Sequence, residues 1–269
     1  MTQDRPPFRP DPKALIVASF QVATASAFLA VWSWMAFHGL PGGPTYPLDL
    51  SAFARPFSAL SVLTFVVAVL ILLKSALRLG RVLRVGAQPA SVALPLSFAL
   101  ITGGLWPLIL HPAPALATAL AGLQVVLALR VLAQSHRALQ SPRRSPVLRL
   151  TQMSRRIARL RFLSIAPVAL FAGWSIAVTG SMMAVTLKDP IGIAPGAAVA
   201  VALLAIALLA LGTQLAAHRT PELSLSVIWA LIGTAATQIG LPGHETLPVT
   251  LMAVAGISLL AAGIVRVST

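Results

Sequence analysis

Eight long apolar runs constrain this 269-residue chain more than any other feature. A helix needs about 20 mainly apolar residues to cross a bilayer, at about 1.5 Å rise per residue. Runs of this kind occupy residues 14–38, 57–79, 91–110, 113–134, 163–187, 194–217, 222–241 and 246–265. Only 10% of the residues are charged and the mean hydropathy is +0.88, which is too apolar for the surface of a water-soluble domain. We therefore predict an all-α polytopic membrane bundle of about eight transmembrane helices and exclude a soluble enzyme.

The boundaries of the first, third and fourth runs bear on the number of spans. Only His111-Pro112 separates run 91–110 from run 113–134, so a single re-entrant pair is an alternative to two spans. The polar, Pro-rich segment 1–13 precedes a first run that is too long for the core of a signal peptide. We therefore expect the first run to remain as an uncleaved helix.

The positive charges predict the orientation of the bundle. With the N-terminus in the cytoplasm, 18 of the 20 Lys and Arg residues fall on the cytoplasmic side, and only Arg55 and Lys188 fall outside. Cytoplasmic loops of membrane proteins carry this excess of positive charge. We therefore expect both termini in the cytoplasm, a bacterial inner membrane as the location, and an anionic inner leaflet rather than nucleic acid as the partner of the basic segments.

The long connection in the middle of the chain has a pattern of its own. Apolar residues recur at helical spacing over 146–162, and between them lie Arg149, Arg155, Arg156, Arg159 and Arg161. This pattern predicts an amphipathic helix on the inner leaflet. A topology anchor is the simpler interpretation, and a docking arm for an acidic partner or a specific lipid is the alternative. We divide the chain into a tail, 1–13, a five-helix bundle, 14–187, that includes the basic loop 135–162, and three further spans in 188–269.

The predicted spans hold few groups that could perform chemistry. No Asp or Glu lies in the interior of a span, whereas ion-coupled transporters usually place an ionisable group there. The chain contains no HExxH or GxSxG motif and no Cys. We therefore expect no enzymatic activity and no metal site. Three outer-side histidines leave a metal or haem site there as an alternative; they are His38, His111 and His244.

The five tryptophans differ in their depth along the predicted spans. Trp32, Trp34 and Trp106 lie near outer ends, which is typical of an interfacial aromatic belt. Trp174 and Trp229 lie deeper, where an indole N–H needs a partner and the ring offers a face for stacking. Core packing is the simpler interpretation of these two residues.

Four short motifs in order carry a resemblance to a known family. Residues 167–179 read P-V-A-L-F-A-G-W-S-I-A-V-T, which resembles the fifth-helix signature of the TspO-type tryptophan-rich sensory proteins. Residues 229–233, W-A-L-I-G, resemble a motif of their long bacterial relatives, which have additional C-terminal spans. Phe57-Ser58 and Trp106 are weaker matches, and Leu60 stands where that family has a tryptophan.

The resemblance implies a five-helix ligand-binding bundle followed by three extra spans. In that family a pocket beneath the loop that joins the first two helices accepts flat hydrophobic ligands: tetrapyrroles such as a porphyrin or haem, sterol-like molecules and isoprenoid lipids. Here the segment Gly39–Pro56, with four prolines, would form the loop. The resemblance places on the pocket wall Phe57, Leu60, Trp106, Phe171, Gly173 and Trp174. The alternatives are a structural or assembly protein that docks a partner complex or forms a homo-oligomer, and a passive transporter.

Overall fold

The computed structural model describes residues 11–38, 59–85, 92–110, 112–140, 165–189, 191–216, 220–239 and 254–264. Its helices are α1 (Pro12–His38), α3 (Ala59–Val85), α4 (Ala93–Ile109), α5 (Pro114–Gln140), α7 (Ala166–Lys188), α8 (Pro195–Ala216) and α9 (Pro221–Ile239). A further helix follows at Val254–Ile264. The described ranges hold no β-strand. The prediction of an all-α membrane bundle is therefore confirmed.

Five of the helices are long and apolar enough to cross a membrane by length and composition: α1, α3, α5, α7 and α8. Three apolar helices are shorter; they are α4, the segment Pro221–Gly233 of α9, and Val254–Ile264. With 17 residues, α4 is about 26 Å long, slightly less than the hydrocarbon core of a bilayer. The next helix, α5, has 27 residues, which is too long for one arm of a re-entrant pair.

Prolines mark where several of the helices begin. α1, α5, α8 and α9 each start at a proline, and α7 has Pro167 in its first turn. Proline suits this position because the first N–H groups of a helix have no partner within the helix, and its φ angle is already helical. The starts of these helices are therefore encoded locally.

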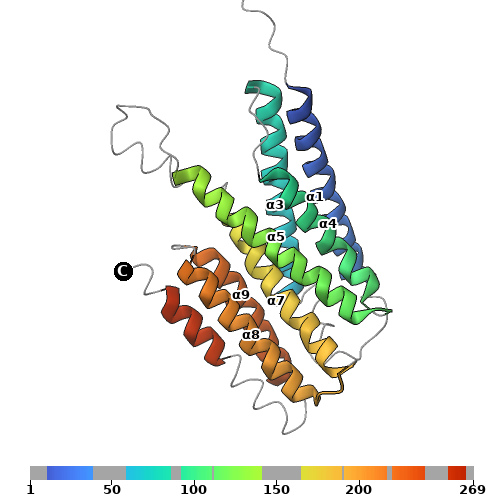
Figure 1. Cartoon of the computed structure of the whole chain (residues 1–269), viewed down its shortest axis with the longest axis vertical. Coiled ribbons are helices and arrows are strands. Elements are labelled where there is room, and N and C mark those ends of the chain that lie inside the picture. The colour runs from blue at the N-terminus through green and yellow to red at the C-terminus, as the bar shows by residue number, and fades with distance from the viewer. Residues whose placement is uncertain are drawn as a thin grey trace, which may run out of the picture.

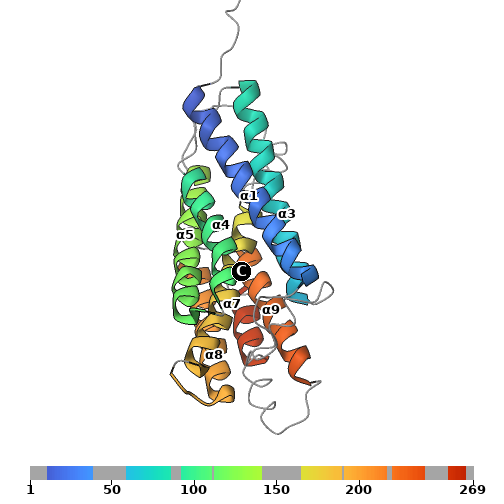
Figure 2. The ribbon, with the colours of Figure 1, turned by 90° about the vertical axis from the view of Figure 1, so that its right-hand side faces the viewer.

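The helix α7 lies at the centre of the bundle. Successive helices run in opposite directions, and α7 packs against α3 and α5 on one side and against α8 and α9 on the other (Figures 1 and 2). In its span 83% of the residues are buried, against 28–39% in the other four long spans. α8 and α9 therefore pack directly on the last helix of the predicted five-helix unit.

Two glycines let neighbouring helices approach α7 closely. A Cβ atom on Gly173 would collide with the backbone carbonyl oxygen of Leu223 in α9. A Cβ atom on Gly180 would collide with the side chain of Ile206 in α8. Without a hydrophobic driving force between helices in lipid, such close contacts provide much of the packing energy.

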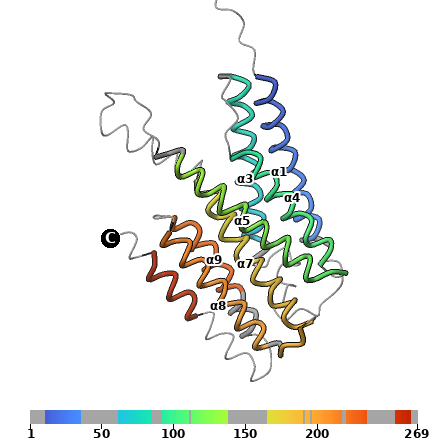
Figure 3. Tube along the Cα trace, viewed as in Figure 1, coloured from blue at the N-terminus to red at the C-terminus, as the bar shows by residue number. Residues whose placement is uncertain are grey.

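The described positive charges gather toward one end of the bundle. This basic end holds the start of α1 and the finish of α3 and α5, and α7 starts in the same half of the bundle, beside the middle of α3 (Figures 1 and 3). Seven described Lys and Arg residues lie in this half, namely Lys13, Lys74, Arg78, Arg81, Arg84, Arg130 and Arg137. Helix α7 ends at Lys188, which lies at the opposite end of the bundle. The alternating directions of the helices agree with the charge pattern of the sequence.

Reporter fusions test which side of the membrane the basic end faces. We expect fusions after Ser141 and Thr269 to report the cytoplasm and a fusion after Asp189 to report the opposite side, because positive charge is retained in the cytoplasm. A C-terminal fusion that reports the same side as the fusion after Asp189 would contradict both the orientation and the even number of spans.

Candidate ligand site: a buried aromatic cluster

Five aromatic side chains from three helices meet in the core of the bundle. We call them the aromatic cluster; they are Phe28 and Trp32 of α1, Trp106 of α4, and Phe171 and Trp174 of α7. Each is at most 4% exposed. The ring of Trp174 meets Phe28 and Trp32 edge to face, with centroids 5.6 and 5.2 Å apart. These are favourable aromatic geometries, each worth about 0.5–1.5 kcal/mol beyond the area they bury.

The α1 contribution to the cluster comes from a buried stripe. Phe28 and Trp32 are four residues apart, and Ala25 and Met35 continue the same buried face. Trp34, two residues from Trp32, is 49% exposed instead. The aromatic-belt interpretation was therefore wrong for Trp32, because depth along a helix does not tell its lipid face from its core face. It was wrong for Trp106 for the same reason.

Phe28 was not among the site residues predicted from the sequence. Its signal was the spacing of Gln21, Ala25, Phe28 and Trp32, which repeats every three or four residues and includes a polar side chain. A buried amide in that stripe indicates a face turned toward other helices rather than toward lipid.

Two of the three indoles in the cluster donate hydrogen bonds to neighbouring helices. Trp174 Nε1–H donates to Thr64 Oγ1 of α3 at 2.8 Å, and Trp32 Nε1–H donates to the carbonyl oxygen of Gly103 at 3.2 Å. Trp106 Nε1–H is buried and has no hydrogen-bond partner among the described residues. Hydrogen bonds therefore fix two indoles of the cluster to neighbouring helices, and the N–H of Trp106 is left without a partner among the described residues.

A buried amide lies beside the cluster. Gln124 of α5 is fully buried, and its Nε2 donates to Ser175 Oγ at 2.9 Å. The absence of a side chain at Gly103 lets it approach, since a Cβ atom there would lie 2.9 Å from Phe28 Cε2 and 3.0 Å from Gln124 Nε2. Gln124 Oε1 is buried without a partner in the described part of the chain. A buried polar atom without a hydrogen-bond partner lowers folding stability by about 1–3 kcal/mol. A ligand that paired with Trp106 Nε1–H or Gln124 Oε1 would recover part of this cost.

The side chains of the cluster and its neighbour Gln124 can stack on a ligand and form hydrogen bonds with it. Its rings offer faces for stacking, Trp106 offers a donor, and the neighbouring Gln124 offers an acceptor. None of these six side chains is ionisable, so none can serve as a general acid or base near neutral pH. In the described ranges no group of three or more His, Asp or Glu side chains could hold a metal ion. His111 and His244 lie outside those ranges, and His38 ends α1.

The structure brings together three of the six predicted pocket residues. Trp106, Phe171 and Trp174 are all members of the aromatic cluster. The space beside Gly173 is filled by the backbone of α9 rather than left for a ligand. Leu60 lies in the first turn of α3, and Phe57 lies outside the described residues. The segment Gly39–Pro56 and the basic loop residues Arg149, Arg155, Arg156, Arg159 and Arg161 also lie outside them.

The fold and this cluster define a polytopic α-helical membrane protein with an aromatic core. A family model described as TSPO-like protein matches residues 87–266, which is more than half of the chain. The chain therefore belongs to the TSPO-like family, and the resemblance found in the sequence is confirmed. The match includes α4 and every later described helix, whereas Phe57-Ser58 precedes it. Comparisons with curated proteins and with solved structures gave no match.

Proposed function

We propose that the protein binds or senses a flat hydrophobic ligand at the aromatic cluster, in the manner of a membrane receptor and without enzymatic turnover. The ligand would belong to the tetrapyrrole, sterol-like or isoprenoid classes, and the membrane would be a bacterial inner membrane. The observation that carries the proposal is a pair of buried polar atoms, Trp106 Nε1–H and Gln124 Oε1, which have no hydrogen-bond partner in the described ranges and lie next to stacking faces. A ligand with one acceptor and one donor would satisfy both atoms. Membership of the TSPO-like family supports the same class of function.

The packing of the cluster limits how a ligand could enter. Ring centroids of its members lie 5.2–6.2 Å apart, so the rings are in direct contact. A porphyrin or haem does not fit between them in this arrangement. Binding of a ligand of that size therefore requires at least one aromatic side chain to rotate away. A narrower ligand requires a smaller displacement.

Replacing Trp106 by phenylalanine tests the proposal. Trp106→Phe keeps an aromatic ring and removes the buried N–H, which offsets part of the cost of the space that the smaller ring leaves, so we expect folding stability to change by no more than about 1 kcal/mol. Binding of protoporphyrin IX, measured by quenching of the remaining tryptophan fluorescence, should weaken about tenfold, which corresponds to about 1.4 kcal/mol. Weaker binding at a nearly unchanged melting temperature would indicate that Trp106 contacts the ligand.

The matched control is Trp34→Phe, because Trp34 is half exposed and lies outside the cluster. This variant should bind the probe like the wild type. The proposal fails if the wild-type protein shows no saturable quenching with protoporphyrin IX, a sterol or an isoprenoid lipid carrying a quencher. It also fails if both substitutions weaken binding equally.

A structural or assembly function is the second candidate, and the close packing of the cluster favours it. Fully buried aromatic rings in mutual contact rigidify a bundle whether or not a ligand binds. In this case the bundle would present a stable surface to a partner complex or to a second copy of the chain. Purification from native membranes in a mild detergent tests it: a stoichiometric partner and no saturable ligand would support the assembly function.

A further inference from the structure

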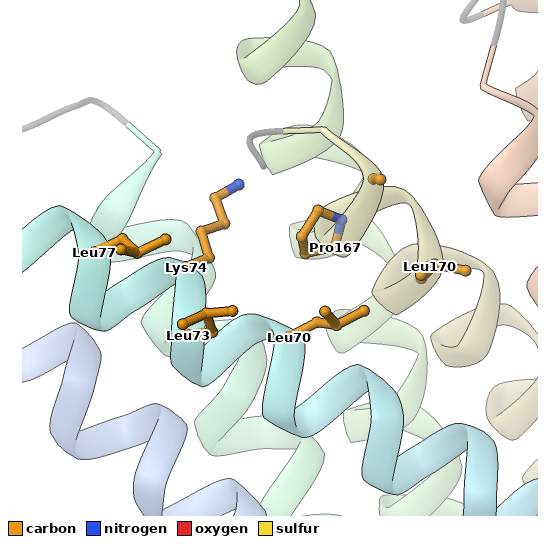
Figure 4. Close-up of a pocket in the computed structure, with 7 residues that line it drawn as sticks. Leu70, Leu73, Lys74, Leu77, Pro167 and Leu170 are labelled. Carbon is orange, nitrogen blue, oxygen red and sulfur yellow. The ribbon is translucent and has the colours of Figure 1, made fainter. Parts of the chain in front are cut away.

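A small cavity lies away from the aromatic cluster, between α3 and the start of α7 (Figure 4). Its volume is about 80 Å³, and its lining residues are Leu70, Leu73, Lys74, Leu77, Ala166, Pro167 and Leu170. Sites for drug-sized molecules usually measure about 300–1,000 Å³. The cavity is therefore too small to enclose a tetrapyrrole, but it can hold a few methylene groups.

The cavity is a groove on the outer surface of the bundle rather than a closed void. Leu73 of α3, which lies on the deeper side of Lys74, is 48% exposed, whereas Ala166 and Pro167 of α7 are buried at its inner wall. In a membrane-spanning helix, exposed leucines of this kind contact lipid. The groove therefore opens toward the acyl chains of the bilayer.

The end of the groove is positively charged. Three basic residues, Lys74, Arg78 and Arg81, follow one another on α3 at intervals of four and three residues. Lys74 lines the groove, and the Arg78 guanidinium donates a hydrogen bond to Gln21 Oε1 of α1 at 3.0 Å. Figure 4 shows the Lys74 side chain extending from α3 beside Pro167. The first turn of α7 has no side-chain cap, so the positive end of its dipole faces the same region.

The depth of Lys74 matches that of a lipid headgroup. Lys74 lines the groove together with Ala166 and Pro167, the first residues of α7, so it lies level with the start of that helix. With 23 residues, α7 is about 35 Å long, slightly more than the hydrocarbon core. Its start therefore lies at the membrane boundary, and Leu70 and Leu170 lie one turn deeper among the acyl chains.

We propose that this groove is a specific site for one anionic phospholipid. Its headgroup phosphate would pair with the Lys74 ammonium, and one acyl chain would lie against Leu70, Leu73 and Leu170. Charge complementarity selects this occupant, because an anionic lipid such as phosphatidylglycerol carries a net negative charge that is attracted to the basic residues of α3, whereas phosphatidylcholine has no net charge. The site is separate from the aromatic cluster and does not depend on the proposed ligand function.

The test compares two lipids on the purified full-length protein in a neutral detergent. We expect phosphatidylglycerol to remain bound in native mass spectra and to raise the melting temperature more than phosphatidylcholine does. Lys74→Gln should lower the apparent affinity for phosphatidylglycerol at least fivefold and leave that for phosphatidylcholine unchanged. The variant should fold, since it removes a charge from a membrane-spanning helix.

Three further variants distinguish a specific site from general attraction to anionic lipid. Lys74→Arg keeps the charge and should retain the preference for phosphatidylglycerol. Leu170→Trp fills the groove with every charge intact and should abolish the preference. Arg130→Gln removes an exposed cation of α5 outside the groove and should have no effect. The proposal is overturned if the wild type does not distinguish the two lipids, if Leu170→Trp keeps the preference, or if Arg130→Gln and Lys74→Gln behave alike.

Discussion

Gly173→Ala is expected to destabilise the bundle by about 3 kcal/mol, at the upper end of the usual cost of overpacking. The added Cβ atom would collide with the carbonyl oxygen of Leu223 and would lie 2.9 Å from Ser226 Cβ. A backbone carbonyl cannot move away by a change of rotamer, so α7 and α9 must separate. Thermal unfolding in detergent, followed by the loss of the monodisperse peak in size-exclusion chromatography, measures the effect.

Gly122→Ala is the control for this substitution. Gly122 lies in the middle of α5, and a Cβ atom there would have no neighbour within 4 Å. Alanine favours a helix over glycine by about 1 kcal/mol, so this variant should be neutral or slightly more stable. Equal melting temperatures for Gly122→Ala and Gly173→Ala would show that α9 does not contact α7 as described.

Trp174→Ala is expected to cost about 4 kcal/mol of stability. The ring is fully buried, contacts three other aromatic rings and donates a hydrogen bond to Thr64. Truncation of a buried tryptophan leaves a cavity that the surrounding helices fill only in part. Thermal unfolding in the same detergent would report the loss.

The comparison variant is Trp34→Ala, in which a half-exposed ring is removed from the same bundle. It should cost much less, because lipid or detergent replaces the contacts of an exposed ring. Similar losses at both positions would mean that Trp174 is not part of a packed core. Trp174 is therefore a poor position for a binding test, since folding and binding would be lost together, and Trp106→Phe separates the two effects.

The two proposed sites differ in what they would recognise. The aromatic cluster offers stacking faces, and Trp106 and the neighbouring Gln124 offer two buried polar atoms without a partner among the described residues. The groove between α3 and α7 offers leucines and a cation at the membrane boundary. Porphyrin quenching tests the first and lipid retention tests the second, so the failure of one leaves the other unaffected.

Much of the architecture was readable from the sequence. Apolar runs of sufficient length predicted the helices, because every backbone polar group in lipid must be satisfied within a helix. The starts of α1, α5, α8 and α9 were not predicted from their prolines, although a proline suits this position because the first N–H groups of a helix have no partner within it. The motif around Trp174 predicted the family that the match over residues 87–266 confirms. These properties depend on local sequence alone.

Only the tertiary structure decided which face of each helix is buried. Trp32 and Trp34 are two residues apart, about 200° around a helix, and one is 4% exposed while the other is 49% exposed. Hydropathy could not separate them, because lipid tails are as apolar as a protein core and both faces carry similar residues. In the same way Gly173, expected at a ligand wall, contacts α9, and the groove beside Lys74 exists only because α7 starts next to the middle of α3. Such contacts join residues far apart in the chain, and they arise only when the helices pack together.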